Sequence, residues 1–342
     1  MPTIIDVAER AGVSITTVSH VINETRYVSD ELTNRVYEAM RELNYRPNTL
    51  ARSLRSGRTK TIGLVIPDIS NMFYAEISRK IEDKGFEYEF SVILCNTDDD
   101  PKKEESYINV LLEKQVDGII FISVGGAEEN LEKPINLGIP TIVVDRDIQG
   151  ATSDVVLVDN LKGGYDAAKY LFSLNHRRIG CISGPSLVTP SARRLEGCKM
   201  ALSEVNIKID DSLIETGDFR FESGEDAMRN LLKLINPPTA VFACNDMMAL
   251  GAMRAVSDYG LNIPEDISLI GFDNIPISKS VYPALTTIAQ PITEMADLIV
   301  EMLVRRISQK KNKRKSDEKL DDYKRVVMET KLIERGSCKV LG

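Results

Sequence analysis

From Thr61 onward, short apolar runs alternate with longer segments in which apolar and polar residues recur at helical spacing. The apolar runs have the length of β-strands: IGLVIP, FSVILCN, DGIIFIS and PTIVVD come first, and RRIGCISG, TAVFACN and DISLIGF follow. Amphipathic segments such as PKKEESYINVLLEKQ separate them. Alternation of this kind is typical of parallel sheets that helices cover on both faces. The two sets of strands therefore predict an α/β body, residues 61–342, with two similar lobes.

The N-terminal residues show helical spacing alone. A capping box of Thr3 and Asp6 opens the first predicted helix, and Gly12 supplies the positive φ angle that ends it. Ser14 caps a second helix, and a third helix starts at Ser29. The apolar faces of the second and third helices carry Val18, Val21, Ile22, Leu32, Val36, Ala39, Met40 and Leu43. Together the three helices predict a small all-α core.

Two features of this region point to DNA. The second helix leaves Thr16, Thr17 and His20 on its early or opposite surface, where the recognition helix of a helix-turn-helix domain carries its base contacts. Hydroxyl and imidazole groups can both donate and accept hydrogen bonds at base edges. The alternative for His20 is an ordinary surface histidine without a role in DNA binding. After Pro47, Asn48 caps another helix that is too short to be stable alone in water. We expect this segment to order when it meets a partner.

Several motifs occur in a fixed order along nearly the whole chain. They are IIDVAERAGVSITTVSHVIN and RYVSDELTNRVYEAMRELNYRPNTLARSLRSGRTKTIGLVIPDISNMFY, followed later by NDMMALG, PEDISLIGFDN and LTTIAQP. In these motifs the chain resembles the LacI/GalR family of bacterial transcriptional regulators, and within it the ribose repressors most. The TTVSHVIN helix is similar to that of both purine and ribose repressors. The resemblance implies a homodimeric, sequence-specific repressor of double-stranded operator DNA, with a two-lobed body like that of periplasmic binding proteins.

The resemblance also divides the chain. It implies a helix-turn-helix DNA-binding domain over residues 1–46, a hinge helix and linker over 47–60, and an effector-binding and dimerisation domain over 61–342. The chain is expected to cross between the lobes near residues 158–160, 290–291 and 321–323. Lobe one then contains residues 61–159 and 291–321, and lobe two contains 160–290 and 322–338. The charged insert QKKNKRKSDEKLDDYK, residues 309–324, predicts a solvated loop, with DNA binding as the alternative.

The resemblance assigns DNA contacts to particular residues. It implies base contacts from Thr16, Thr17 and His20, backbone positioning by Asn23, Arg26 and Tyr45, and hinge contacts by Asn48, Ala51 and Leu54. In the family, the hinge helix pairs with its copy from a second subunit in the minor groove. A leucine at the position of Leu54 wedges between central base pairs there and kinks the duplex. An ordinary linker helix is the alternative for this segment.

Polar and aromatic side chains follow the predicted strands of the body. In open parallel α/β folds, ligands bind beyond the carboxyl ends of the strands, so residues at these ends are candidates for an effector site. Aromatic rings cover the apolar faces of a sugar, while carboxylate, amide and guanidinium groups pair with its hydroxyls. Helix capping or core packing explains each residue equally well when it is taken alone. The candidate set is Asn71, Phe73, Tyr74, Asp145, Arg146, Arg194, Phe219, Asn245, Asp273 and Gln290.

The NxFY and DR elements of this set resemble the sugar pocket of periplasmic ribose-binding proteins. This resemblance implies D-ribose or a similar monosaccharide as the effector, acting as an inducer, with no cofactor and no metal ion. A purine corepressor, suggested by TTVSHVIN, is one alternative. A catabolite control protein that acts with the phosphorylated HPr phosphocarrier is another, because IPDISNMFYAEI and KQVDGIIF are similar to that group.

Composition narrows the classes of protein further. The net charge is −8, but residues 1–60 carry nine Lys and Arg against seven Asp and Glu, so only the body is acidic. A weakly basic head on an acidic body is compatible with phosphate binding. The five widely spaced cysteines predict neither disulfides nor a zinc site. With no bilayer-spanning run and no signal pattern, we expect a cytoplasmic, nucleoid-associated bacterial protein with no membrane partner.

A sugar-processing enzyme is the alternative from a different class. The chain has two histidines, His20 and His176, and His20 lies in the predicted DNA-reading helix. The sequence lacks the GxSxG, P-loop, HExxH and GxGxxG fingerprints. We therefore do not expect an enzyme. A periplasmic transport receptor would share the body but has no use for the N-terminal helices.

Overall fold

The computed structural model describes residues 2–23, 25–46, 58–122, 128–145, 153–186, 188–207, 210–313 and 322–342. The chain divides into two compact units, Met1–Thr59 and Lys60–Gly342. Several sequence-based predictions lie outside the described residues: the hinge residues Asn48, Ala51 and Leu54, the effector residue Arg146, and residues 314–321 of the charged insert.

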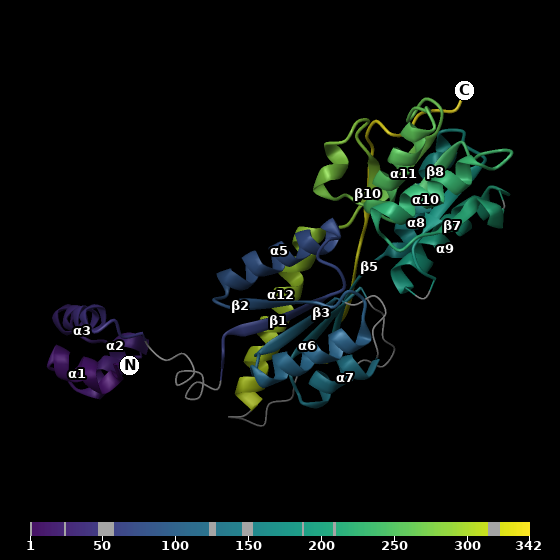
Figure 1. The fold of residues 1–342 in the computed structure, drawn as a ribbon. Helices are drawn as coiled ribbons and strands as arrows, with labels where there is room; N and C mark the ends of the chain where they lie inside the picture. Colours follow the sequence, from purple (N-terminus) through teal and green to yellow (C-terminus); the bar gives the residue numbers. More distant parts are fainter. Residues whose placement is uncertain are drawn as a thin grey trace. The chain divides into compact units, whose positions relative to one another are not determined.

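In its described residues, the N-terminal unit contains three helices, α1 (Ile4–Ala11), α2 (Ile15–Asn23) and α3 (Asp30–Glu42) (Figure 1). The predicted capping box is present, because the Thr3 hydroxyl accepts from the Asp6 backbone while the Asp6 carboxylate accepts from the Thr3 backbone. Gly12 follows α1 with a φ of 64°. The helices enclose a core of Val7, Ala8, Ala11, Val18, Val21, Val36 and Ala39. Leu32, Met40 and Leu43 of the predicted core are only partly buried.

Lobe one of the second unit is built on a parallel sheet in the order β11-β5-β4-β3-β1-β2. Its strands are β1 (Thr61–Ile66), β2 (Ser91–Asn96), β3 (Gly118–Ile122), β4 (Thr141–Val144), β5 (Asp154–Val158) and β11 (Arg325–Met328). Helices α5 (Met72–Glu87) and α12 (Ile292–Lys313) pack on one face of the sheet, and α6 (Pro101–Glu113) and α7 (Glu128–Asn136) on the other. Because successive strand residues face opposite cores, the central strands are apolar throughout.

Lobe two is built on a second sheet in the order β12-β10-β9-β8-β6-β7, in which β12 alone is antiparallel. Its strands are β6 (Ile179–Ser183), β7 (Ile214–Thr216), β8 (Ala240–Ala243), β9 (Ser268–Asp273), β10 (Thr286–Ala289) and β12 (Lys331–Ile333). Its helices are α8 (Asn160–Ser173), α9 (Thr189–Glu204), α10 (Phe221–Leu232) and α11 (Asp246–Asp258), with short 3-10 helices η1 (Asp211–Leu213) and η2 (Pro276–Lys279). The predicted fold class, a helical domain followed by two parallel-sheet lobes, is confirmed.

The last crossing between the lobes differs from the expectation. Strand β11 pairs in parallel with β5, so residues 322–328 belong to lobe one and not to lobe two. The chain crosses between Met328 and Lys331, and the expected crossing at 321–323 is wrong. Val326 and Met328 explain the difference, because both pack against the lobe-one core. The two earlier crossings fall at 158–160 and 289–292, in agreement with the expectation.

The charged insert is also not a loop throughout. Residues 309–313 continue α12, which ends at Lys313. Arg306 on this helix is 8% exposed and makes two hydrogen bonds of 2.7 Å to the Asp154 carboxylate. It also donates to the Asp322 carbonyl at 2.8 Å. This buried charge pair holds the end of α12 and the start of β11 together at the base of the insert.

Candidate functional site

The predicted recognition helix α2 buries Val18 and Val21 against the head core. Ser14 holds the start of the helix: its hydroxyl accepts from the Thr17 backbone N–H at 3.0 Å and shares a hydrogen bond of 2.8 Å with the Thr17 hydroxyl. Thr16 is exposed, whereas Thr17 is half-buried. Thr17 therefore contributes to the helix cap, and Thr16 presents its side chain to solvent.

The other predicted DNA-contacting residues have different surroundings. His20 Nδ1 shares a hydrogen bond of 2.8 Å with the hydroxyl of Thr25, in the turn after α2. The Asn23 side chain donates to a backbone carbonyl one turn earlier at 2.8 Å. Tyr45 is half-buried against the head core, and Arg26 is exposed. Thr25, which the sequence analysis did not single out, thus orients the His20 ring.

In the second unit, predicted effector residues meet in a narrow cavity of about 20 Å³ between the lobes. Eight predicted residues line it: Asn71, Phe73, Tyr74, Asp145, Arg194, Phe219, Asn245 and Asp273. Pro190 lines it as well and was not predicted. Gln290 lies behind Asp273, to whose carboxylate its side chain donates at 2.7 Å. The cavity has room for about one water molecule, whereas small-molecule pockets typically measure about 300–1,000 Å³.

Strand ends and helix starts position these side chains. Asn71 and Asn245 are the N-caps of α5 and α11, and each accepts from a backbone N–H of its helix, at 3.0 Å and 2.9 Å respectively. Asp145, Phe219 and Asp273 have φ angles of 60°, 70° and 112°. Non-glycine residues rarely adopt these conformations, which are costly and concentrate at binding sites. The carboxyl ends of the strands thus carry strained residues that face the cavity.

Arg194 on α9 is the most connected side chain of the cavity, although it is only 4% exposed. Its guanidinium donates to the Asn160 side chain at 2.7 Å and to the Cys244 carbonyl at 2.6 Å. It also lies 3.5 Å from the Asp273 carboxylate and 3.7 Å above the centre of the Phe272 ring. These contacts fix the guanidinium in one orientation before any ligand binds.

Asn160 connects the two lobes and was missed by the sequence analysis. It is the first residue of α8, directly after the chain has crossed from lobe one. Its side-chain nitrogen donates to the Asp145 carboxylate at 3.2 Å, while its oxygen accepts from Arg194. Asn160 therefore links an acid of lobe one to the guanidinium of lobe two. Its place at a predicted crossing, beside the strand ends, was the available signal.

Burial controls the acid–base properties of the cavity. It raises the pKa of Asp273 to about 7, although Arg194 and Gln290 oppose the shift. It also raises the pKa of Asp145, again against the effect of Arg194. The pKa of the Tyr74 hydroxyl lies well above its ordinary value because of burial and the neighbouring acids. Two carboxyl groups that resist ionisation and one guanidinium suit an uncharged, hydrogen-bonding ligand.

Three aromatic rings complete the lining. The Phe73 and Tyr74 rings meet edge to face with their centres 5.2 Å apart. The Phe219 ring packs against Gly184, where a Cβ atom would come within 2.3 Å of the ring. Gly184 is therefore required for the close approach of Phe219. The rings offer apolar surface beside the acids, amides and guanidinium.

Asp246, the second residue of the NDMMALG motif, supports the cavity from behind and was also missed. It is fully buried and accepts from the Ile275 backbone at 2.9 Å and from the Thr287 hydroxyl at 2.6 Å. Burial raises its pKa well above the ordinary value. These bonds hold the segment that follows β9, and with it Asp273.

An ion pair joins the lobes beside the cavity. The Arg220 guanidinium lies 3.3 Å from the Asp68 carboxylate, which also accepts from the Ser70 backbone at 2.9 Å. Arg220 directly follows Phe219, and Asp68 precedes Asn71 by three residues. The pair therefore connects the turns that carry cavity residues in each lobe.

Metal ligands, cysteines and membrane-spanning helices were considered among the residues that the structure describes. In these residues, no three or more His, Cys, Asp and Glu side chains are grouped to hold a metal ion. Cys95, Cys181, Cys198 and Cys244 are buried free thiols, and Cys338 is partly buried. None of the described helices is long and apolar enough to cross a membrane.

Comparisons with known sequences give a consistent result for both units. Residues 3–48 match the family "Bacterial regulatory proteins, lacI family", and residues 168–338 match "Periplasmic binding protein-like domain". The chain is 45% identical to the HTH-type transcriptional regulator DegA of Bacillus subtilis, over 86% of this chain and 88% of that protein. It is 41% identical to the ribose operon repressor of Escherichia coli, over 90% of this chain and 94% of that protein. It is 40% identical to the HTH-type transcriptional repressor PurR of Edwardsiella ictaluri, over 98% of this chain and 97% of that protein.

Solved structures agree with this result. The lac repressor dimer bound to operator and the anti-inducer ONPF is similar with a TM-score of 0.86 and 26% identity, over 99% of both chains. A LacI family regulator from Enterococcus faecium with bound ribose is similar with a TM-score of 0.73 and 33% identity, over 82% of this chain and 100% of that one. These relatives are transcriptional regulators and not enzymes. The chain belongs to the lacI family of bacterial regulatory proteins and is a DNA-binding transcriptional repressor.

Proposed function

We propose that the protein is a homodimeric repressor whose affinity for a pseudo-palindromic operator is lowered by a small sugar, with D-ribose as the inducer. The observation that carries this proposal is the interlobe cavity, where Arg194 and Asp273 from lobe two meet Asp145, Asn71 and two aromatic rings from lobe one. No cofactor is needed for this role.

The chemistry of the cavity matches a monosaccharide. Sugar hydroxyls both donate and accept, so they pair with carboxylates, amides and a guanidinium at the same time. The rings of Phe73, Tyr74 and Phe219 offer apolar surface to the C–H groups of the sugar. The ribose-bound regulator from Enterococcus faecium and the ribose operon repressor of Escherichia coli support D-ribose as the sugar.

The narrowness of the cavity connects sugar binding to the arrangement of the lobes. A space of about 20 Å³ admits no monosaccharide, so the lobes separate or shift when the sugar enters. A ligand moves an equilibrium only when it binds one state more tightly than the other. We infer that the sugar-bound arrangement is less compatible with the operator than the sugar-free one, with a coupling of about 1–3 kcal/mol.

DNA recognition is assigned to the head and hinge. Thr16 and His20 on α2 are the proposed base-reading residues, with Thr17, Asn23, Arg26 and Tyr45 in supporting positions. Asn48, Ala51 and Leu54 remain a proposal from the family resemblance, with Leu54 as the minor-groove wedge. The lac repressor dimer on its operator supports this arrangement.

Exposed apolar residues in lobe one support the homodimer. Phe86 is 76% exposed, Leu94 is 41% exposed and Tyr88 is 36% exposed. They lie at the end of α5 and on β2, the edge strand of the lobe-one sheet. Apolar side chains grouped beside an open sheet edge commonly mark a protein–protein contact.

A purine corepressor is the second candidate, and the identity to PurR favours it. Calorimetric titration of the purified protein with D-ribose, hypoxanthine, guanine and phosphorylated HPr separates the candidates. We expect D-ribose alone to bind, and to lose binding in the Asp273→Ala variant. Binding of a purine or of phosphorylated HPr, without D-ribose, would overturn the proposed effector and leave the DNA-binding role in place.

A further inference from the structure

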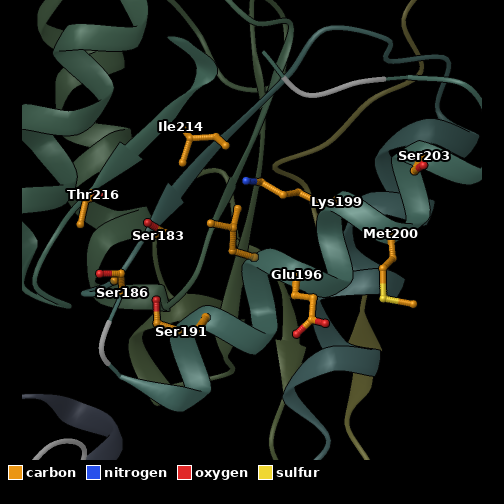
Figure 2. A pocket seen from close by; sticks show the side chains of 12 residues that line it. Ser183, Ser186, Ser191, Glu196, Lys199, Met200, Ser203, Ile214 and Thr216 are labelled. Atoms are coloured by element: carbon orange, nitrogen blue, oxygen red, sulfur yellow. The ribbon is translucent and has the colours of Figure 1, made fainter. Parts of the chain in front are cut away.

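A second and larger cavity lies within lobe two. It is a groove of about 520 Å³ between helix α9 and the strands β6 and β7, and β7 is the edge strand of the sheet (Figure 2). This volume is in the ordinary range for small-molecule sites. None of its lining residues lines the interlobe cavity, although Arg194 lies on the same helix. The two cavities share α9 but present different side chains.

One end of the groove is rich in hydrogen-bonding groups. Figure 2 shows Ser183, Ser186 and Ser191 together at this end. Ser191 is 1% exposed, and its hydroxyl has no hydrogen-bond partner within the part of the chain that the structure describes. Leaving such a group unpaired in the protein interior is costly. The buried Ser191 hydroxyl therefore indicates a missing partner.

The same end coincides with the start of α9. The N-cap position is Val188, which has no side chain that could accept from the first N–H groups of the helix. The uncapped N-terminus of a long helix carries partial positive charge and attracts anions. Together with the serine hydroxyls, it forms a donor-rich corner suited to a carboxylate.

The rest of the groove is apolar, with a cation above it. Leu195 and Ile214 form part of the apolar wall, and Lys199 extends over the groove toward Ile214. Glu196 is engaged by Arg193 at 2.9 Å, while Lys199 has no ion pair among the described residues. Lys199 follows the serine end by two turns of helix, about 12 Å along the axis. The groove therefore fits an elongated, mostly apolar molecule that carries negative charge.

We propose that this groove is a second ligand site, and that it binds an elongated carboxylate with an apolar chain. The carboxylate accepts from the Ser191 and Ser186 hydroxyls at the start of α9, the chain lies against Leu195 and Ile214, and Lys199 complements the charge. The groove is lined by other residues than the interlobe cavity, although its Gly184 packs against the Phe219 ring, and the proposal does not depend on the sugar proposed for that cavity.

Calorimetric titration of the full chain with sodium octanoate tests this site, with octanamide as the uncharged control of equal length. We expect octanoate to bind in one-to-one ratio, about tenfold more tightly than octanamide. Ser191→Ala is expected to weaken octanoate binding about fivefold or more because it removes a buried donor. Ile214→Trp is expected to abolish binding by filling the groove.

Variants of Lys199 test whether its positive charge contributes to octanoate binding. Lys199→Gln is expected to weaken octanoate binding severalfold, and Lys199→Arg is expected to restore it. Lys169→Gln, at an exposed lysine of α8 outside the groove, serves as the matched control and leaves binding unchanged. Asp273→Asn separates the two sites, because it alters the interlobe cavity and leaves octanoate binding intact.

Four results would overturn the proposal. They are no binding of octanoate to the natural protein, equal binding of octanoate and octanamide, unchanged binding in Ser191→Ala, and loss of binding in Asp273→Asn. The last result would place octanoate in the interlobe cavity.

Discussion

The two halves of the interlobe cavity are held in place by different forces. In lobe two, Arg194, Asn245 and Asp273 are connected by hydrogen bonds to one another or to fixed carbonyl groups. In lobe one, Phe73 and Tyr74 are anchored mainly by packing in the apolar core. Lobe two therefore presents a preorganised polar network, while lobe one presents shape and apolar surface. The positions of the polar side chains in lobe two therefore depend on a few hydrogen bonds, whereas the positions of the rings in lobe one depend on many weak packing contacts.

This difference predicts unequal responses to mutation. Removing one member of a buried charge network leaves its partners unpaired, which is strongly destabilising. Removing one polar group from the packed half costs only the bond that it makes.

Arg194→Ala is expected to have the largest effect. It leaves Asp273 and Asn160 without their buried partner, and we expect about 3–5 kcal/mol of lost stability together with loss of sugar binding. Urea unfolding and calorimetry measure the two effects. The neighbouring Arg193→Ala is the matched control: Arg193 is exposed and pairs with Glu196, so about 0–1 kcal/mol is expected. Similar losses in both variants would contradict the network.

Asp273 predicts a dependence on pH. Its pKa in the folded protein is about 7, whereas an unfolded aspartate titrates near pH 4. The folded protein therefore binds an extra proton between these values, and the stability from this group is lost as the pH rises through 7. The loss amounts to roughly 4 kcal/mol between pH 4 and pH 8. Asp273→Asn is expected to reduce the slope by this amount in urea unfolding measured across that range, while Asp145 and Asp246, whose pKa values burial also raises, keep their contributions. An unchanged slope would show that the pKa of Asp273 is the same in the folded and unfolded protein.

Two asparagine caps provide a direct comparison of the lobes. Asn71 accepts one backbone hydrogen bond, whereas Asn245 accepts one and also donates to the Phe219 carbonyl at 2.9 Å. Asn71→Ala is expected to cost about 1 kcal/mol and Asn245→Ala about 2 kcal/mol in urea unfolding. Substitution by Asp keeps both caps but removes the bond to Phe219. It should therefore restore the lobe-one variant more completely than the lobe-two variant; equal rescue would contradict this assignment.

Arg220→Ala is expected to have the smallest effect. The pair with Asp68 joins the lobes, but the Arg220 side chain is 53% exposed. Its contribution to stability should stay below about 1 kcal/mol and decline further at high salt. Because the pair closes the lobes beside the cavity, its loss is expected to change D-ribose affinity by a few-fold at low salt. Affinity that is identical at low and high salt in the natural protein would argue against a closing role.

The sequence predicted the polar residues of the cavity well because strand ends are recognisable from the chain alone. Asn71, Asp145, Asn245 and Asp273 each follow an apolar run, and parallel sheets bring such positions together. Asn160, Pro190 and Asp246 were missed for a common reason. Their roles depend on the crossing of the chain and on contacts from behind the cavity, which no local pattern records.

The assignment of the last two strands to a lobe also could not be predicted from local sequence patterns. β11 and β12 are short and separated by two residues, so the sequence around them predicts one continuous strand as readily as two. Their assignment to different lobes depends on which core Val326 and Met328 reach. In the head, by contrast, capping residues mark the start and end of α1 directly, and the predicted boundaries agree with the structure.

The most direct test of repression controlled by a sugar measures operator affinity with and without D-ribose, using a pseudo-palindromic duplex selected by the protein from random sequences. We expect saturating D-ribose to weaken binding of the natural protein by about 5–150-fold, which corresponds to a coupling of about 1–3 kcal/mol, and to leave the Arg194→Ala variant unaffected. Operator affinity that does not change with D-ribose, or that increases, would contradict the proposal that this cavity holds an inducing sugar.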